Sequence, residues 1–261
     1  MTRASSLTRR ALDAVASLIF PAPCRICEAT LVTASGIPVC AACLEAIQAI
    51  TGPQCARCGR PFVAGAAVPA GAQCHLCRRG AYDFDAARSW ATYNDTLTRA
   101  IVLLKYHAVT PLAGWLAGRL ADLATREPQA FAADVVVPVP LHPARLRQRG
   151  HNQAELIARP LARRLGLPVK AALLARTRPR PEKRRLTRKE RWSTVKGAYL
   201  AREGTVVDRR VLLVDDVFTT GATLDACSRA LRKAGAARVS AVTVARVAPD
   251  WAPPQQPPAR P

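Results

Sequence analysis

The sequence predicts an α/β protein in which a parallel sheet flanked by helices follows a small cysteine-rich module. Three observations support this prediction. Eight of the nine cysteines lie before residue 80. Beyond them, short apolar runs alternate with longer segments of helical periodicity, and two of the apolar runs end in polar loops. The 261 residues suffice for one sizeable α/β domain and a small appended module.

The first twenty residues combine arginines with an apolar stretch, a pattern that superficially resembles a secretion signal. Asp13 interrupts the apolar stretch, and Pro21–Cys24 makes a poor cleavage site. We therefore expect the N-terminal segment, residues 1–20, to contain an amphipathic helix over residues 7–20. No apolar run is long enough to span a bilayer. The sequence thus predicts a cytoplasmic protein without a transmembrane segment.

Four Cys-x-x-Cys pairs occupy residues 21–82. Each pair can present two thiolates to one metal ion, and two pairs complete a tetrahedral zinc site. A disulfide framework does not suit a chain without an export signal, and redox-active pairs usually occur singly. We therefore predict a double zinc ribbon with two structural zinc ions, whose pairs combine either sequentially or in a cross-braced arrangement. The predicted ligands are Cys24, Cys27, Cys40, Cys43, Cys55, Cys58, Cys74 and Cys77.

The α/β domain is predicted to span residues 83–248. Three apolar runs have the character of strands: residues 86–93, 134–139 and 211–214. Four segments have helical periodicity: residues 96–106, 111–125, 154–165 and 224–234. Cys227, on the last of these helices, is expected to be a buried core residue. The tail, residues 249–261, is rich in proline and glutamine and is predicted to be disordered.

The most informative stretch follows the predicted strand 211–214. Asp215 and Asp216 come where that strand should end. A small turn then leads into the helix 224–234, and it consists of Thr219, Thr220, Gly221, Ala222 and Thr223. Backbone N–H groups at a helix N-terminus favour a phosphate, while adjacent carboxylates can bind sugar hydroxyls or a divalent cation. The pattern predicts a site for a phosphorylated sugar, with an ordinary strand–loop–helix connection as the alternative.

This stretch resembles the ribose-5-phosphate fingerprint of type I phosphoribosyltransferases. The resemblance implies that Asp215 and Asp216 contact the ribose hydroxyls, and that the 219–223 loop binds the 5′-phosphate of phosphoribosyl pyrophosphate in the presence of Mg²⁺. It implies a type I phosphoribosyltransferase-like sheet. The motif specifies the ligand more than the reaction, because some relatives with this fold bind the ligand as a regulator.

Two further motifs extend the resemblance to the ComF family. Residues 137–142 read Val-Pro-Val-Pro-Leu-His, and Arg149-Gly150 is followed by Asn152-Gln153. Together with the cysteine-rich front end and the phosphate loop, they match the order of motifs in that family of amidophosphoribosyltransferase-like proteins. The resemblance implies that Arg145, Arg149 and Asn152 hold pyrophosphate or the incoming substrate. It also implies a role in DNA uptake, with single-stranded DNA and the competence helicase or recombination mediator proteins as partners.

The net charge of +21 favours a polyanionic partner, although an arginine-rich composition can also serve only to solvate the surface. Residues 176–196 carry ten of the cations against two acids. This segment is interpreted as a hood over the ligand, as a contact surface for nucleic acid with Trp192 available for base stacking, or as a solvated loop. It departs from the family pattern near Lys183 and Thr194, where glutamine and asparagine are expected.

Two functions remain open from the sequence. The first is an enzyme that transfers a phosphoribosyl group to an unidentified nucleophile, with positioning and charge rather than a general base supplying the catalysis. The second is a non-catalytic zinc-ribbon adaptor that handles single-stranded DNA, with the sugar-phosphate site as a sensor or a relic. A steep salt dependence of DNA binding would favour the second function.

Overall fold

The fold of the chain is given by a computed structural model, which describes residues 23–31, 36–63, 67–179 and 187–247. The predicted N-terminal helix, the predicted disordered tail and part of the cationic segment, residues 180–186, lie outside the described residues. Within the described part of the chain, no helix has the length and apolar character needed to cross a membrane.

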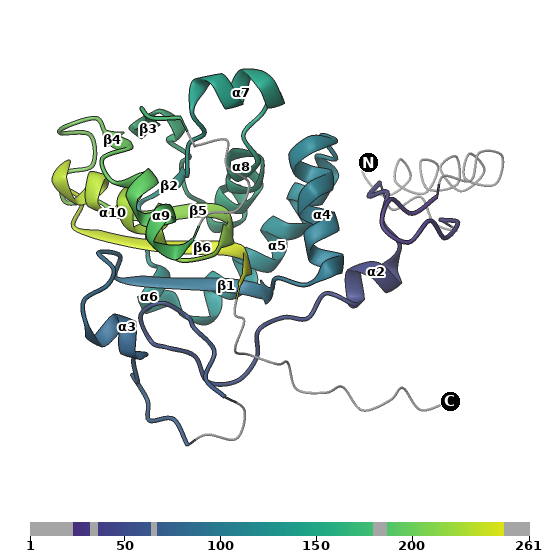
Figure 1. The fold of residues 1–261 in the computed structure, drawn as a ribbon, viewed down its shortest axis with the longest axis horizontal. Helices are drawn as coiled ribbons and strands as arrows, with labels where there is room; N and C mark the ends of the chain where they lie inside the picture. The colour runs from purple at the N-terminus through teal and green to yellow at the C-terminus, as the bar shows by residue number, and fades with distance from the viewer. Residues whose placement is uncertain (1–22, 32–35, 64–66, 180–186, 248–261) are drawn as a thin grey trace, which may run out of the picture.

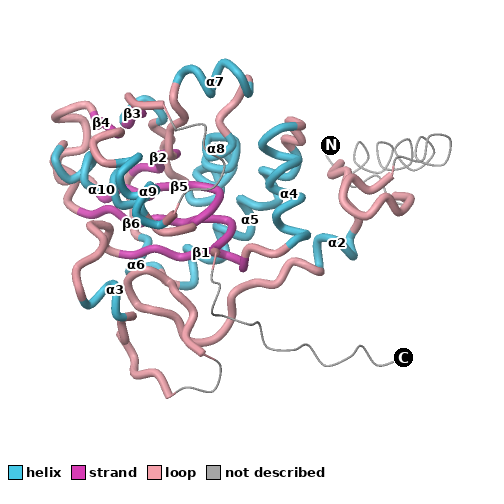
Figure 2. The backbone as a smooth tube through the Cα atoms, viewed as in Figure 1, coloured by secondary structure: helices cyan, strands magenta, loops and turns pink. Residues whose placement is uncertain are grey.

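A four-stranded parallel sheet forms the centre of the molecule (Figures 1 and 2). Its strands are β1 (Ala86–Thr92), β6 (Arg238–Arg246), β5 (Arg210–Phe218) and β2 (Val135–Pro138), in that spatial order. The three predicted strands are therefore confirmed. β6 had not been predicted, yet it lies between β1 and β5 and is hydrogen-bonded to both.

Helices cover both faces of the sheet, as predicted, because alternate residues of a strand point to opposite sides. Leu212 and Val214 belong to a core that includes residues of three helices: α4 (Asp95–Tyr106), α5 (Pro111–Arg126) and α8 (Gln153–Leu165). A short helix, α6 (Pro128–Phe131), follows α5 and contributes Phe131 to the same core. All four predicted helices are present, the fourth being α10 (Ala222–Lys233).

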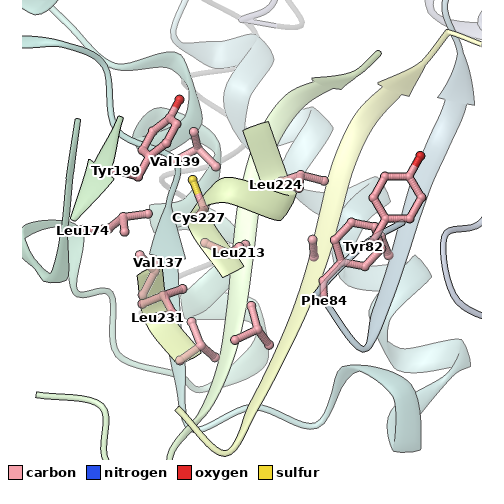
Figure 3. Packing of buried hydrophobic residues seen from close by; sticks show 14 of the residues in the cluster. Tyr82, Phe84, Val137, Val139, Leu174, Tyr199, Leu213, Leu224, Cys227 and Leu231 are labelled. Carbon is pink, nitrogen blue, oxygen red and sulfur yellow. The ribbon is translucent and has the colours of Figure 1, made fainter. Parts of the chain in front are cut away.

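The opposite face of β5 presents Val211 and Leu213 to a second core. Figure 3 shows this core, in which Cys227 and Leu231 of α10 lie near side chains of the sheet. Cys227 is completely buried, which confirms its predicted place. A small two-stranded antiparallel sheet and two short helices border the core: β3 (Leu174–Arg176), β4 (Tyr199–Ala201), η1 (Ala171–Leu173) and α9 (Arg188–Val195).

The two cysteine-rich loops pack against different parts of the α/β domain (Figure 1). The first loop contains α2 (Ala41–Glu45) and shares a small core with α4 and α5. The second contains α3 (His75–Arg78) and lies along β1, where the backbone N–H of Ala87 donates to the carbonyl of Arg57 at 2.7 Å. The second loop approaches β1 closely at Gly59, whose φ is +67° and where a Cβ would stand 2.6 Å from the Ala87 carbonyl oxygen.

Candidate functional site

The eight paired cysteines form two four-cysteine clusters in sequential order: 24, 27, 40 and 43 in one, and 55, 58, 74 and 77 in the other. In each cluster the sulfur atoms lie within 4.8 Å of one another. A tetrahedral zinc ion with bonds of about 2.3 Å requires sulfur atoms about 3.8 Å apart. The separations of 3.9 Å between Cys24 and Cys43 and 3.7 Å between Cys58 and Cys74 meet this requirement.

Backbone N–H groups point at several of these sulfur atoms. Cys24 Sγ accepts from the N–H of Ile26 and of Cys40, at 3.4 and 3.3 Å, and Cys55 Sγ accepts from the N–H of Cys74 at 3.3 Å. Such donors stabilise thiolates, the form in which cysteine binds zinc. The donor set, its geometry and its surroundings fit two structural zinc ions, and the sequential pairing replaces the cross-braced alternative.

A pocket of about 380 Å³ opens at the carboxyl ends of the sheet strands, where ligands bind in parallel α/β sheets. Segments that follow all four strands line it. The predicted residues that line it are Asp215, Asp216, Thr219, Thr220, Ala222, Thr223, Arg145 and Arg149. The structure thus brings together the two carboxylates, the threonine loop (residues 219–223) and the arginines of the 145–149 segment.

The two carboxylates lie inside β5, which corrects the prediction that they follow its end. β5 continues to Phe218 because β6 pairs with it along its whole length, with Asp215 opposite Thr243 and Phe218 opposite Arg246. Neighbouring residues of a strand point to opposite faces, so the two carboxyl groups reach the pocket from different sides of the sheet. Both side chains are largely buried, with 8% of Asp215 and 5% of Asp216 exposed.

The surroundings of the two carboxyl groups shift their pKa values in opposite directions. Burial and the adjacent Asp216 carboxylate raise the pKa of Asp215 well above its ordinary value. Burial also opposes the ionisation of Asp216, but an ion pair with Lys105 of α4 outweighs it and lowers the pKa of Asp216. The Gln153 side chain donates a further hydrogen bond to Asp216 at 3.3 Å. Of the two carboxyl groups, Asp216 is therefore the more readily ionised.

Within the threonine loop, Gly221 forms the N-cap of α10 with a φ of +82°. A Cβ on Gly221 would stand 2.5 Å from Tyr82 and 2.9 Å from Phe218, so the two aromatic rings pack directly against the loop at this residue. The Tyr82 hydroxyl donates to the carbonyl of Thr220 at 3.1 Å. Gly221 itself does not line the pocket but fixes the path of the residues that do.

We predict that Gly221→Ala weakens anion binding at the loop by about tenfold or more and lowers stability by about 1–3 kcal/mol, because the new methyl group both strains the backbone and displaces two rings. The matched control is Gly204→Ala, where φ is +72° and no atom lies within 4 Å of the added Cβ. Thermal unfolding and calorimetric titration with ribose 5-phosphate measure the two effects. Equal losses of binding in both variants would contradict the prediction.

Two arginines of the pocket, Arg145 and Arg149, are carried by α7 (Pro143–Arg149), a short helix that had not been predicted. Arg149 donates to the Tyr106 hydroxyl and to the Gln153 amide oxygen, both at 3.0 Å, and its guanidinium lies 4.7 Å from the centre of the Tyr106 ring. Gln153 in turn contacts Asp216. A connected set of side chains thus runs from the cationic wall of the pocket to the carboxylate pair.

Asn152 is placed differently from the expectation that it holds the ligand. Its amide nitrogen donates to the carbonyl of Val139 at 3.0 Å, and its amide oxygen accepts from the N–H of Ala154 as the N-cap of α8. It is buried and does not line the pocket. Asn152 therefore fixes the loop after β2 against α8, and acts on the pocket only through that loop.

Sequence reasoning missed several residues that line the pocket. Lys105 is separated from Asp216 by more than a hundred residues, so no local motif joins them. Gln153 had been noted as part of a motif without a role. Arg176 and Tyr199 come from the unpredicted pair of strands β3 and β4, where the Arg176 guanidinium donates to the Tyr199 hydroxyl at 3.0 Å. Of these residues, only Arg176 had been included in the segment interpreted as a hood over the ligand.

The second cysteine cluster is connected to the threonine loop through Arg246 at the end of β6. This buried guanidinium donates to the carbonyl of Cys58 at 2.7 Å and lies 4.1 Å from the centre of the Phe218 ring. Phe218 is in edge contact with Tyr82, which holds Thr220. The second cysteine cluster and the threonine loop therefore contact the same pair of buried aromatic rings, Phe218 and Tyr82, the former through Arg246.

The fold and the site define a phosphoribosyltransferase-type domain joined to a double zinc ribbon. Two family models match the chain accordingly: the phosphoribosyl transferase domain over residues 151–260, and the double zinc ribbon domain over residues 15–78. The chain is 30% identical over 214 residues to competence protein F of Haemophilus influenzae, covering 80% of this chain and 90% of that protein. The chain belongs to the ComF family.

Other relatives carry related names. Competence protein ComFC of Bacillus subtilis is 28% identical over 214 residues, covering 80% of this chain and 84% of that protein. The DNA utilization protein YhgH of Escherichia coli K12 is 29% identical over 226 residues, covering 85% and 96%. Among solved structures, the glutamine phosphoribosylpyrophosphate amidotransferase of B. subtilis matches 52% of this chain and 26% of its own, with 25% identity and a TM-score of 0.36.

Proposed function

We propose that the chain binds phosphoribosyl pyrophosphate together with Mg²⁺. The observation that carries the proposal is the convergence of three groups in one pocket: the carboxylate pair of β5, the threonine loop at the N-terminus of α10, and the arginines of α7. A ligand with a terminal phosphate, vicinal hydroxyls and a pyrophosphate presents matching chemistry. In this arrangement the loop takes the 5′-phosphate, the carboxylates accept from the ribose hydroxyls, and Arg145 and Arg149 face the pyrophosphate.

The pocket suits a Mg²⁺ ion that arrives with the ligand. Mg²⁺ is usually held by one or two carboxylates plus substrate phosphates and water. Asp215 and Asp216 supply the carboxylates. The described residues at this site include no group of three or more metal-binding side chains, so the remaining ligands of the ion would come from the bound phosphates and water. The positive charge of a bound ion would also favour ionisation of Asp215, which burial and Asp216 oppose. The two carboxylates would hold the ion, which would neutralise the developing charge of pyrophosphate.

We further propose that the protein transfers the phosphoribosyl group to an acceptor. When the bond between the ribose and pyrophosphate breaks, positive charge develops on the ribose and negative charge on the leaving group. The buried carboxylates lie where they can stabilise the former, and the arginines of α7 where they can stabilise the latter. No side chain of the pocket needs to act as a nucleophile in this scheme.

Isothermal calorimetry with phosphoribosyl pyrophosphate and Mg²⁺ tests the binding proposal, with ribose 5-phosphate and pyrophosphate as partial ligands. We expect tighter binding of the complete ligand than of either part, and a large loss of affinity without Mg²⁺. Undetectable binding of all three would refute the proposal. Incubation of the labelled ligand with candidate acceptors then tests transfer: an absence of both transfer and hydrolysis would leave binding without catalysis.

A second candidate function is binding of single-stranded DNA as an adaptor in DNA uptake. The names of the relatives, which refer to competence and DNA utilization, and the net charge of +21 favour it. Association with competence helicase or recombination mediator proteins belongs to the same proposal. Binding to oligothymidylate should weaken steeply as salt increases; salt-insensitive binding would exclude this function. We propose a cytoplasmic location, where cysteines remain reduced and available to zinc.

A further inference from the structure

A second concave surface, the α9 groove, lies between α9, β4 and α10 and has a volume of about 650 Å³. Trp192 of α9 and Leu200 of β4 line it, together with Ala226 and Ala230 of α10, which are four residues apart. Leu200 is 60% exposed. Large apolar side chains that remain open to solvent beside small ones mark a surface suited to receive another apolar group.

The edge of the α9 groove is positively charged. Lys189, Lys196 and Lys233 are exposed there, and the structure shows no ion pair for them with any described residue. The single carboxylate among the lining residues, Asp225, is buried and already accepts from the backbone N–H of Asp83 at 2.8 Å and from Arg229 at 2.9 Å. An occupant with negative charge around an apolar centre would therefore complement this surface.

We propose that the α9 groove docks an acidic amphipathic segment of a partner protein, and that the docked segment holds α9 in place over the ligand pocket. Apolar side chains of the segment would contact Leu200 and Trp192, and its carboxylates would face the three lysines. This is the helix-in-groove mode of peptide recognition, in which an apolar face enters a groove and charges at the edge fix the orientation.

The groove fits a peptide better than a nucleic acid. The Trp192 ring is stacked on the Tyr82 ring, with the centroids 6.0 Å apart and the planes 27° from parallel, so one face of the indole is covered. Single-stranded nucleic acids bind to open aromatic platforms, on which successive bases stack. The α9 groove instead combines Leu200 and small alanines with an indole that has one face covered.

α9 separates the groove from the ligand pocket. Arg191 and Thr194 line the pocket. Trp192, which follows Arg191 and so lies about 100° further round the helix, lines the groove together with Lys196, the C-cap of α9. Two residues, Val195 and Tyr199, line both. A segment that immobilises α9 would therefore also fix Arg191 beside the ligand, and this second part of the proposal rests on the proposed function.

Fluorescence anisotropy with a short labelled amphipathic peptide, with leucines on one helical face and glutamates on the other, tests docking on the full chain. We expect saturable binding that weakens when glutamine replaces every glutamate. Leu200→Asp should weaken binding by about tenfold or more, and Lys233→Glu by about threefold to tenfold. The matched controls, Val63→Asp at a 72% exposed site and Lys170→Glu at an exposed site away from the groove, should leave binding unchanged.

Three results would overturn the docking site: no binding of the glutamate peptide, equal weakening in the control variants, or displacement of the peptide by oligothymidylate whose own binding is lost in Leu200→Asp. The last result would assign the groove to nucleic acid. Circular dichroism melting of each variant confirms that the fold is retained before binding is compared.

Calorimetry with phosphoribosyl pyrophosphate and Mg²⁺, at saturating peptide and without it, tests the link through α9. We expect severalfold tighter binding of the ligand with the peptide present, and an equal effect of the ligand on the peptide, since coupling is reciprocal. Identical affinities would overturn the link. A complete absence of ligand binding would instead refute the proposed function, while the docking result would stand independently.

Discussion

Replacing Cys77 by serine is expected to abolish cooperative folding, whereas replacing Cys40 is expected only to weaken it. A structural zinc site contributes about 10–16 kcal/mol in isolated zinc-finger peptides, as much as the whole stability of a typical domain, about 5–15 kcal/mol. The two clusters differ in what depends on them. All four cysteines of the second cluster are buried, whereas Cys27 of the first is exposed and Cys40 is half-buried.

The second cluster belongs to the main core. Its cysteines share a hydrophobic cluster with Tyr82, Phe84 and Phe218, and with residues of the sheet. Removing one thiolate would release the zinc, the Cys58 loop and the Arg246 contacts together. Among the described residues, the hydrophobic contacts of the first cluster are with α4, α5 and the neighbouring loop, so its loss should leave the sheet and the ligand pocket assembled.

Zinc content by atomic absorption and thermal unfolding by circular dichroism measure these outcomes. Each variant should lose about one zinc ion per chain. Cys40→Ser should retain a cooperative transition at a lower Tm, and Cys77→Ser should show none. Cys227→Ala, which removes a buried thiol that is not in either cluster, controls for the loss of sulfur and should retain both zinc ions. A cooperative transition in Cys77→Ser would contradict the prediction.

The metal clusters could be predicted from the sequence because the chemistry is local. Each Cys-x-x-Cys pair places two ligands on one tight turn, and the spacing between pairs allows two of them to complete a four-cysteine zinc site. Only the choice between sequential and cross-braced pairing required the structure, because both satisfy the same spacing. The threonine loop was also predictable, since the strand, the turn and the helix that form it are consecutive.

The remainder of the pocket was not predictable, because it depends on contacts between distant segments. Lys105 of α4 pairs with Asp216 of β5 across more than a hundred residues of sequence. β6 lies at the centre of the sheet but mixes apolar residues with Ser240, Thr243 and Arg246, which lowers its resemblance to a buried strand. Those polar residues are buried nonetheless, and the Thr243 hydroxyl is satisfied by Ser89 of β1 at 2.7 Å.

Asp215→Asn is expected to stabilise the unliganded protein at neutral pH and to weaken binding of phosphoribosyl pyrophosphate with Mg²⁺ by about tenfold to a hundredfold. The second effect follows from the loss of a charged acceptor, whose hydrogen bonds contribute about 1.5–3 kcal/mol each. The first follows from linkage. Because burial and Asp216 raise the pKa of Asp215 in the folded state, the native protein holds this proton more tightly than the unfolded chain does.

The sign of the pH dependence is therefore fixed. The contribution of Asp215 to stability is greatest below the unfolded pKa of 3.8 and falls as the pH rises toward the raised folded value. Asparagine has no carboxyl group to ionise, so the Asp215→Asn variant does not lose this stability as the pH rises. The two proteins should have similar Tm values below about pH 4, and the variant should be higher by several degrees at neutral pH, since about 1 kcal/mol moves the Tm of a chain of this size by about 2–4 °C.

Asp134→Asn provides the matched control, because its linkage has the opposite sign. The Arg210 side chain, 2.7 Å from the Asp134 carboxylate, and the Arg210 backbone N–H lower the pKa of Asp134 to about 2. Its stabilising contribution is present above the unfolded pKa of 3.8 and is lost as the pH falls toward 2. Asp134→Asn should therefore lower the Tm at neutral pH without changing ligand affinity.

If both variants moved the Tm in the same direction, the electrostatic account of the carboxylate pair would be wrong. If Asp215→Asn bound the ligand normally, Asp215 would have no part in binding.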